Sequence, residues 1–95
     1  AHVYSTEGSR VSLAGRTVTL SGTMNFADAF VAVARAGVLM AHGMTFTGSY
    51  TVTGKRFDAS QLGFVFTAGG GANYFPGNAT GTGSTPGTSP YGLYV

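Results

Sequence analysis

Apolar side chains alternate with small or polar ones in several short stretches of the chain. In the first stretch the apolar positions are Val11, Leu13, Val18 and Leu20, with a break at residues 14–15. Alternation with period two and many β-branched residues is typical of strands that bury one face. The pattern therefore predicts an all-β chain in which these four residues face inward. Further runs of the same kind occupy residues 44–46, 50–52 and 64–66.

The strand-like runs recur at a nearly fixed separation. Residues 11–26 (VSLAGRTVTLSGTMNF) align with residues 38–52 (VLMAHGMTFTGSYTV), and a weaker third copy begins near Gln61. The matched pairs, all at nearly the same spacing, are Val11 with Val38, Thr19 with Thr45, Ser21 with Thr47, Phe26 with Val52, and Val38 with Val65. A fixed period of roughly 20–50 residues is typical of stacked repeats, in which no unit buries its apolar face alone. We expect a short parallel β-helix or β-solenoid over residues 11–67, with chance similarity among Gly-, Thr- and Val-rich strands as the alternative.

The segment between the two copies has two interpretations. Asn25 and Asp28 have the spacing of a helix N-cap and an acidic third residue, and Gly37 suits a helix end. The alanine-rich sequence between them also favours a helix. Val31 and Val33, however, alternate with alanine as in a strand. Helix and strand both stay open for residues 27–36.

Composition indicates an assembly rather than an isolated chain. Only 8% of the 95 residues are charged, against roughly 25% in ordinary domains, whereas 43% are hydrophobic. A single domain with so few charges leaves its surface poorly solvated unless that surface is rich in Ser, Thr, Asn and Gly or is covered by other copies. The first residue is Ala1 rather than methionine, as expected of a processed chain or a piece of a longer one.

Charge and cysteine content exclude several classes of partner. The net charge is +2, and only Lys55 and Arg56 are adjacent among the basic residues, so we expect no nucleic-acid footprint, which requires clustering on one face. The longest mainly apolar run, residues 29–41, contains Arg35 and is too short to span a bilayer. We therefore expect no membrane insertion. Without cysteine there is neither a disulfide framework nor a thiolate metal site.

The composition changes after Thr67. Residues 68–95 are rich in glycine and contain all three prolines, and the period is lost. Such a segment cannot form a core by itself, yet it carries four aromatic residues, Tyr74, Phe75, Tyr91 and Tyr94. We expect an N-terminal arm over residues 1–10 and an extended C-terminal strap over residues 68–95 that lies against other copies.

Residues 69–78 read GGGANYFPGN and are followed by a Gly/Thr/Ser stretch and a tyrosine-containing end. Together with runs such as VTLSG and TFTG, this sequence resembles the C-terminal region of bacteriophage tail-fibre and tail-spike proteins, over roughly residues 11–95. Such ends often finish in Gly-Gly-Gln-Tyr, whereas this chain finishes in SPYGLYV. The resemblance implies an intertwined homotrimer in the virion, attached to other fibre or virion proteins. It also implies that the tip contacts host-surface glycans or outer-membrane proteins.

No constellation of catalytic or metal-binding residues stands out. His2 and His42 lack the spacing of metal ligands. Asp28 and Asp58 are conceivable as a glycosidase pair, but polar turn residues explain them better. The three glycines at 69–71 lack the lysine and the helix of a phosphate loop. We expect no enzymatic activity, no cofactor and no metal.

Exposed aromatic residues are the best candidates for binding, because a tyrosine ring offers a flat apolar face to a sugar and a hydroxyl to its polar edge. The candidates for receptor or glycan binding are Asn73, Tyr74, Phe75, Tyr91 and Tyr94, and those for a trimer clamp are Phe75, Pro76 and Leu93. The flanks of the repeat at Tyr50 and at Lys55 and Arg56 are the alternative recognition surface. Function then has three interpretations: a viral fibre tip for host attachment, a carbohydrate-binding or carbohydrate-acting module of a bacterial surface protein, and a capsid decoration protein.

Overall fold

The computed structural model describes residues 1–83 and 92–95, and the described chain is all-β. Every strand pairing in it is parallel. The strands are β1 (Val3–Ser5), β2 (Arg10–Ser12), β3 (Thr17–Thr19), β4 (Gly22–Val33), β5 (Val38–Met40), β6 (Thr45–Thr47), β7 (Tyr50–Ala59), β8 (Phe64–Phe66) and β9 (Leu93–Tyr94).

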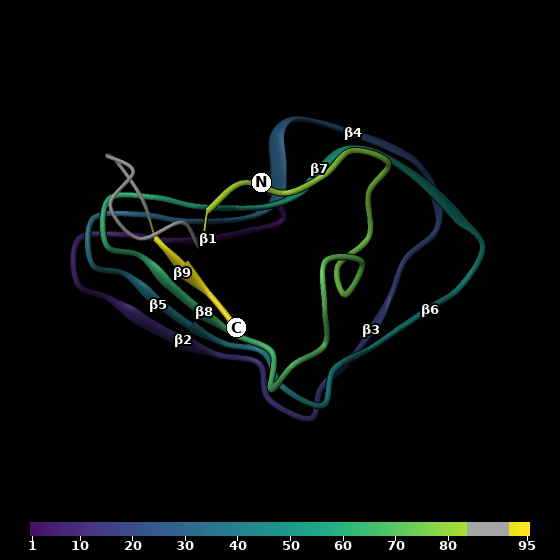
Figure 1. Ribbon diagram of the computed structural model, residues 1–95. Coiled ribbons are helices and arrows are strands. Elements are labelled where there is room, and N and C mark those ends of the chain that lie inside the picture. Colours follow the sequence, from purple (N-terminus) through teal and green to yellow (C-terminus); the bar gives the residue numbers. More distant parts are fainter. Residues whose placement is uncertain (84–91) are drawn as a thin grey trace.

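The strands form three walls around a common interior (Figure 1). One wall has the order β1-β4-β7, the second has the order β2-β5-β8-β9, and the third consists of β3 and β6. The chain visits the walls in turn, so that each circuit, called a coil here, lies on the previous one. The predicted all-β class and parallel stacking are confirmed, and the coiled path is compatible with a β-solenoid. Val3–Ser5, expected in an N-terminal arm, pair with β4 as part of the first coil.

The register between coils differs from the predicted one. Between the first coil and the second, Thr19 pairs with Thr47 rather than with Thr45, and Val11 pairs with Leu39 rather than with Val38. Leu39 in turn pairs with Val65, so the step from the second coil to the third is shorter than the step before it. The shortening falls between Asn25 and Ala29, where the pairing of β4 with β7 contains an irregularity.

Of the two interpretations of residues 27–36, the strand is correct. β4 continues to Val33 and is followed by a turn. Val31 and Val33 are fully buried, whereas Arg35 is exposed. Burial at period two outweighs the helix propensity of alanine, because the strand pairs on both sides, with β1 and with β7. Gly37 does not end a helix; a Cβ there would lie 2.5 Å from the carbonyl oxygen of Ser5 in the coil below.

Inward-facing apolar residues stack into columns that form the core. Val11, Leu39 and Val65 are successive register partners in one column. The four residues predicted to face inward all pack on the core, Leu20 as a buried member and Val11, Leu13 and Val18 as half-buried ones.

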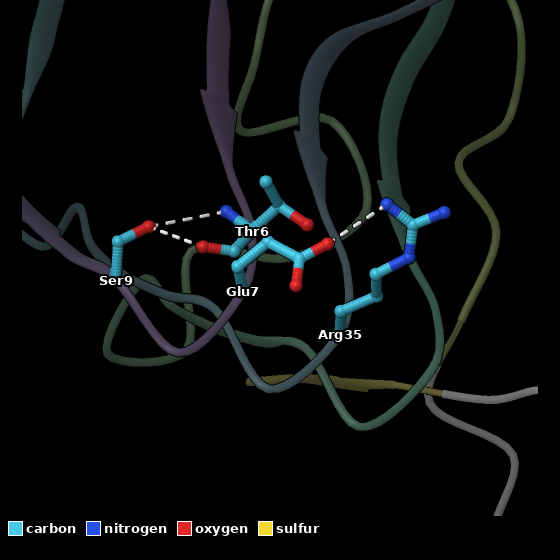
Figure 2. A network of polar contacts seen from close by, with 4 residues as sticks. All are labelled: Thr6, Glu7, Ser9 and Arg35. Atoms are coloured by element: carbon cyan, nitrogen blue, oxygen red, sulfur yellow. Dashed lines mark hydrogen bonds and ion pairs between the residues drawn. The ribbon is translucent and has the colours of Figure 1, made fainter.

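Turns also stack where the chain passes from the first wall to the second. The backbone N–H of Gly8 donates to the carbonyl of Arg35 in the next turn, and the N–H of Ala36 donates to the carbonyl of Gln61 in the third. Figure 2 shows the first two of these turns, with Ser9 bonded to Thr6 and the Arg35 guanidinium 3.1 Å from a Glu7 carboxylate oxygen. This ion pair is exposed on both sides, so it contributes less to stability than the backbone bonds beneath it.

The third coil leaves the wall path after β8. In Figure 1 the green segment that follows β8 runs inside the outline of β3 and β6 instead of lying along it, so β6 pairs only with β3 in the described chain. The segment then returns to the first wall, where single bridges join Lys55 to Ala79 and Asp58 to Thr82. β9 closes the second wall by pairing with β8.

Candidate functional site

A pocket lies at the place where the third coil leaves the wall. It has a volume of about 320 Å³, within the range of roughly 300–1,000 Å³ that is usual for ligand sites. Its walls come from β6, from β7 and from residues 73–77, which cross the interior. The lining residues are Phe46, Tyr50, Val52, Arg56, Asn73, Tyr74, Phe75, Pro76 and Gly77.

An aromatic cluster fixes the inner side of the pocket. The Phe75 ring lies 6.0 Å from Phe46, 6.4 Å from Phe30 and 5.0 Å from Tyr74, measured between ring centroids. The Tyr74 hydroxyl accepts a hydrogen bond of 2.8 Å from the N–H of Met44 and donates to the carbonyl of Ala41. Tyr74 thus bonds backbone groups beside β6, in the region where the third coil no longer follows the wall.

Arg56 is the one charged residue among those that line the pocket. It donates from Nη1 to the carbonyl oxygen of Gly77, which ties β7 to the crossing segment. Among the described residues the ion pairs are Arg35 with Glu7 and Lys55 with Asp58, so no described carboxylate neutralises Arg56. Its Nε is buried and lacks a described hydrogen-bond partner. The buried Nε is therefore out of reach of a ligand, and only the terminal nitrogens of the guanidinium, one of which already bonds Gly77, have donors left for an acceptor in the pocket.

The structure brings four of the predicted site residues, numbered 73–76, together at this pocket. Asn73 is exposed and Tyr74 is half-buried, so both are accessible. Phe75 is 2% exposed and belongs to the core of its own chain. The buried ring therefore supports the pocket from behind and presents little surface to a glycan or to a second chain. Pro76, predicted for the trimer clamp, is also buried and lines the same pocket.

The remaining predicted residues lie elsewhere. Tyr94, on β9, stacks on Phe57 with ring centroids 3.5 Å apart and donates from its hydroxyl to the carbonyl of Gly71 at 2.8 Å. Burial raises the pKa of the Tyr94 hydroxyl to about 12; a hydrogen bond with Thr67 opposes this shift and the neighbouring Tyr74 adds to it. Leu93 is 45% exposed, and Tyr91 lies outside the described residues. Roles for these three in glycan binding or in a trimer clamp stay predictions.

Tyr50, Val52 and Arg56 complete the pocket from β7. From the sequence, Tyr50 and Arg56 were candidates only for the alternative recognition surface on the flanks of the repeat, and Val52 was expected only as part of a strand-like run. Tyr50 is the large aromatic residue at the start of β7, but a single aromatic residue among small polar ones is common on a solvated face, so the sequence carried no clear signal for this part of the pocket.

The titratable side chains in residues 1–83 and 92–95 lie apart from one another or in simple pairs. No group of three or more His, Asp or Glu side chains with metal-binding geometry occurs in the described part of the chain. His2 stacks on Phe30, and His42 lies edge-on to Phe66. Asp58 accepts from Thr82 and pairs with Lys55 at 3.5 Å. The side chain of Asp28 lies outside the described part, so its pairing with Asp58 stays a prediction.

Comparison with family models, with curated proteins and with solved structures finds no match for this chain. The described residues also contain no helix that is long and apolar enough to cross a membrane. The pocket therefore has to be interpreted from its own chemistry. An aromatic face, a carbonyl and amide rim and one arginine suit the binding of a polar ligand, and no nucleophile with a neighbouring base lines them.

Proposed function

We propose that this chain is a structural and receptor-binding part of a bacteriophage tail fibre or spike, which attaches to host-surface glycan through the pocket at Tyr50, Arg56, Asn73 and Tyr74. The observation that carries the proposal is the pocket itself. Tyr50 supplies a 36% exposed ring, Asn73 supplies an amide, and Arg56 supplies donors that no described carboxylate occupies. Flat apolar faces with polar groups at the rim are the usual means of binding a sugar ring.

The rest of the proposal follows from composition and from the resemblance. Stacked coils in parallel register form a stiff support, on which a binding surface keeps its geometry. The resemblance to tail-fibre ends adds a homotrimer, attachment to other virion proteins and a location on the particle. We further propose that the Gly/Pro-rich strap, residues 68–95, lies against neighbouring copies as well as its own coil. The low charge content of 8% is the chemical reason to expect such covered surface.

Binding to purified bacterial surface polysaccharides tests the proposal. Tyr50→Ala and Arg56→Gln should each weaken binding about tenfold, which corresponds to ~1.4 kcal/mol. Tyr4→Ala and Arg16→Gln are matched controls, because both residues are exposed and neither lines the pocket. Equal weakening by the control variants, or no binding by the unaltered chain, would contradict the proposal.

A carbohydrate-binding module of a bacterial surface protein is the second candidate. One observation favours it: all the lining residues of the pocket belong to one chain, as expected for a module that binds as a monomer. Light scattering at micromolar concentration separates the two candidates, with a mass of three chains expected for the fibre and of one chain for the module. Removal of residues 69–95 is less informative, because it also removes the buried Phe75 from the core.

A further inference from the structure

A second hollow adjoins the pocket on the outer surface. It has a volume of about 570 Å³ and is formed by the two stacked corners that lead into β4 and β7. No charged residue lines it; its lining residues are Gly22, Thr23, Gly48, Ser49, Tyr50 and Thr51. We call this hollow the corner groove. Hydroxyl groups, backbone and one tyrosine ring are therefore the chemistry that it offers.

The corner groove belongs to a longer strip of uncharged polar side chains. From residue 17 to residue 25 in the first coil, every second residue carries a hydroxyl or an amide, and the same holds from residue 45 to residue 53 in the second. The register partners in successive coils are Thr17 and Thr45, Thr19 and Thr47, Thr23 and Thr51, and Asn25 and Thr53, and Ser21 and Ser49 occupy the corresponding positions at the corners between them. All but the half-buried Thr53 are exposed. The strip thus presents two rows of hydrogen-bonding groups without a single charge.

Neighbours across the two rows hold one another in place. The hydroxyls of Thr19 and Thr47 lie 3.2 Å apart, and Thr53 donates to the side-chain oxygen of Asn25. Threonine is also stiff at its first side-chain torsion, so little rotamer entropy is lost when such a group bonds a ligand. The surface is therefore preorganised for a polar, uncharged partner.

Tyr50 connects the corner groove to the pocket, because it is a lining residue of both. Thr23, Ser49 and Thr51 line the corner groove together with Tyr50, and Arg56 and Asn73 line the pocket together with Tyr50. A ligand of more than one unit can therefore cross the tyrosine and occupy both hollows together.

We propose that the corner groove is a second subsite of the glycan site, so that the ligand is an extended oligosaccharide that crosses Tyr50. An uncharged sugar unit occupies the groove, and the next unit lies in the pocket against Arg56. This rests on the proposed function, and it adds the class of ligand: a polysaccharide chain rather than a single terminal sugar.

The lining chemistry favours a sugar chain over a peptide. Apart from Tyr50, the groove has no large apolar side chain to receive an apolar anchor of a peptide. Threonine offers both a methyl and a hydroxyl group, which match the mixed apolar and hydroxylated surface of a sugar ring. The groove has no charged residue to pair with an acidic group of the ligand, whereas the pocket contains Arg56. Any acidic group is therefore expected in the pocket.

An array of bacterial O-chain and capsular polysaccharides, presented as intact chains and as oligosaccharides of graded length, provides the probe. For the glycan that binds, we expect affinity to rise at least tenfold between the shortest bound fragment and fragments several units longer. Thr23→Val and Thr51→Val should remove most of that gain, because valine keeps the shape and loses the hydroxyl. Thr17→Val and Thr45→Val are controls from the same strip outside the groove and should leave affinity unchanged. Circular dichroism establishes that all four variants fold.

The outcomes separate this inference from the proposed function. If affinity does not depend on length, or if Thr23→Val and Thr51→Val behave as their controls do, while Tyr50→Ala and Arg56→Gln still weaken binding, the second subsite is refuted and the pocket stands. If none of the glycans binds, both proposals fail. If affinity rises with the length of the glycan and Thr17→Val removes that rise as fully as Thr23→Val does, the glycan lies along the whole strip rather than in the corner groove. That result would overturn the subsite as defined here.

Discussion

Replacement of Phe75 by alanine tests whether the segment that crosses the interior belongs to the core. Phe75 is 2% exposed, and its ring contacts the rings of Phe30, Phe46, Tyr74 and Tyr94 at centroid distances between 5.0 and 6.4 Å. Truncation of a buried phenylalanine costs about 3–5 kcal/mol, including the cavity that remains. The upper part of that range is expected if the four rings, which belong to different parts of the fold, cannot move together to fill the space.

Equilibrium denaturation in urea, followed by circular dichroism, measures this cost. Asn73→Ala is the matched control, because Asn73 lies close by in the same segment and is exposed. A surface substitution of that kind usually changes stability by less than about 0.5 kcal/mol. Phe75→Leu keeps most of the buried volume and should fall between the two.

The measurement also distinguishes a core residue from a clamp between chains. A core residue lowers the free energy of unfolding and leaves the mass of the folded protein unchanged in light scattering. If Phe75→Ala changes the mass and is as stable toward urea as Asn73→Ala, Phe75 acts between chains and the reasoning is refuted.

Three further predictions concern the corners and the tyrosines. Gly48→Ala should destabilise the fold more than Gly15→Ala. Both glycines have positive φ, which costs an L-residue about 1–2 kcal/mol, but only at Gly48 would the new Cβ overlap the carbonyl oxygen of Leu20. Equal unfolding free energies of the two variants in urea would contradict this. Tyr74→Phe should cost about 1–3 kcal/mol, because the N–H of Met44 and the carbonyl of Ala41 lose their hydroxyl partner; a urea midpoint equal to that of the unaltered chain would count against it. Burial raises the pKa of Tyr94 to about 12 in the folded chain. The contribution of Tyr94 to stability is therefore complete below its unfolded pKa of ~10 and is lost as the pH rises toward 12. Between pH 9 and 12, the urea midpoint should fall less steeply for Tyr94→Phe than for the unaltered chain.

The alternation of side chains was sufficient to predict the class of fold and the inward face. Val11, Leu13, Val18 and Leu20 pack on the core as predicted. The register between the coils was harder to predict from the sequence, because Thr-x-Thr occurs in both copies. A slip from one threonine to the next keeps every side chain on its face and still matches threonine with threonine. Alignment by similarity therefore paired Thr19 with Thr45, whereas the structure pairs Thr19 with Thr47.

The pocket was harder to predict, because it arises from a departure from the repeat. Asn73 and Tyr74 were identified from their chemistry, but nothing in residues 68–77 indicates that they cross the interior instead of following β6. The role of Phe75 depends on the same path. An aromatic residue in a glycine-rich segment suggests a surface contact when the path is unknown, and it becomes a core residue only when the segment runs inside the coil.

In the proposed function, the short crossing segment, residues 73–77, serves both stability and binding, through side chains that lie in different environments. Phe75 faces the core, whereas Asn73 lies in the open and Gly77 receives the hydrogen bond from Arg56. Substitution of Phe75 should therefore reduce glycan binding only as far as it unfolds the chain. Substitution of Tyr50 or Arg56 should reduce binding in a chain that is still folded. A Phe75→Leu chain that is folded but does not bind would show that the position of the segment, and not only its presence, determines the shape of the pocket.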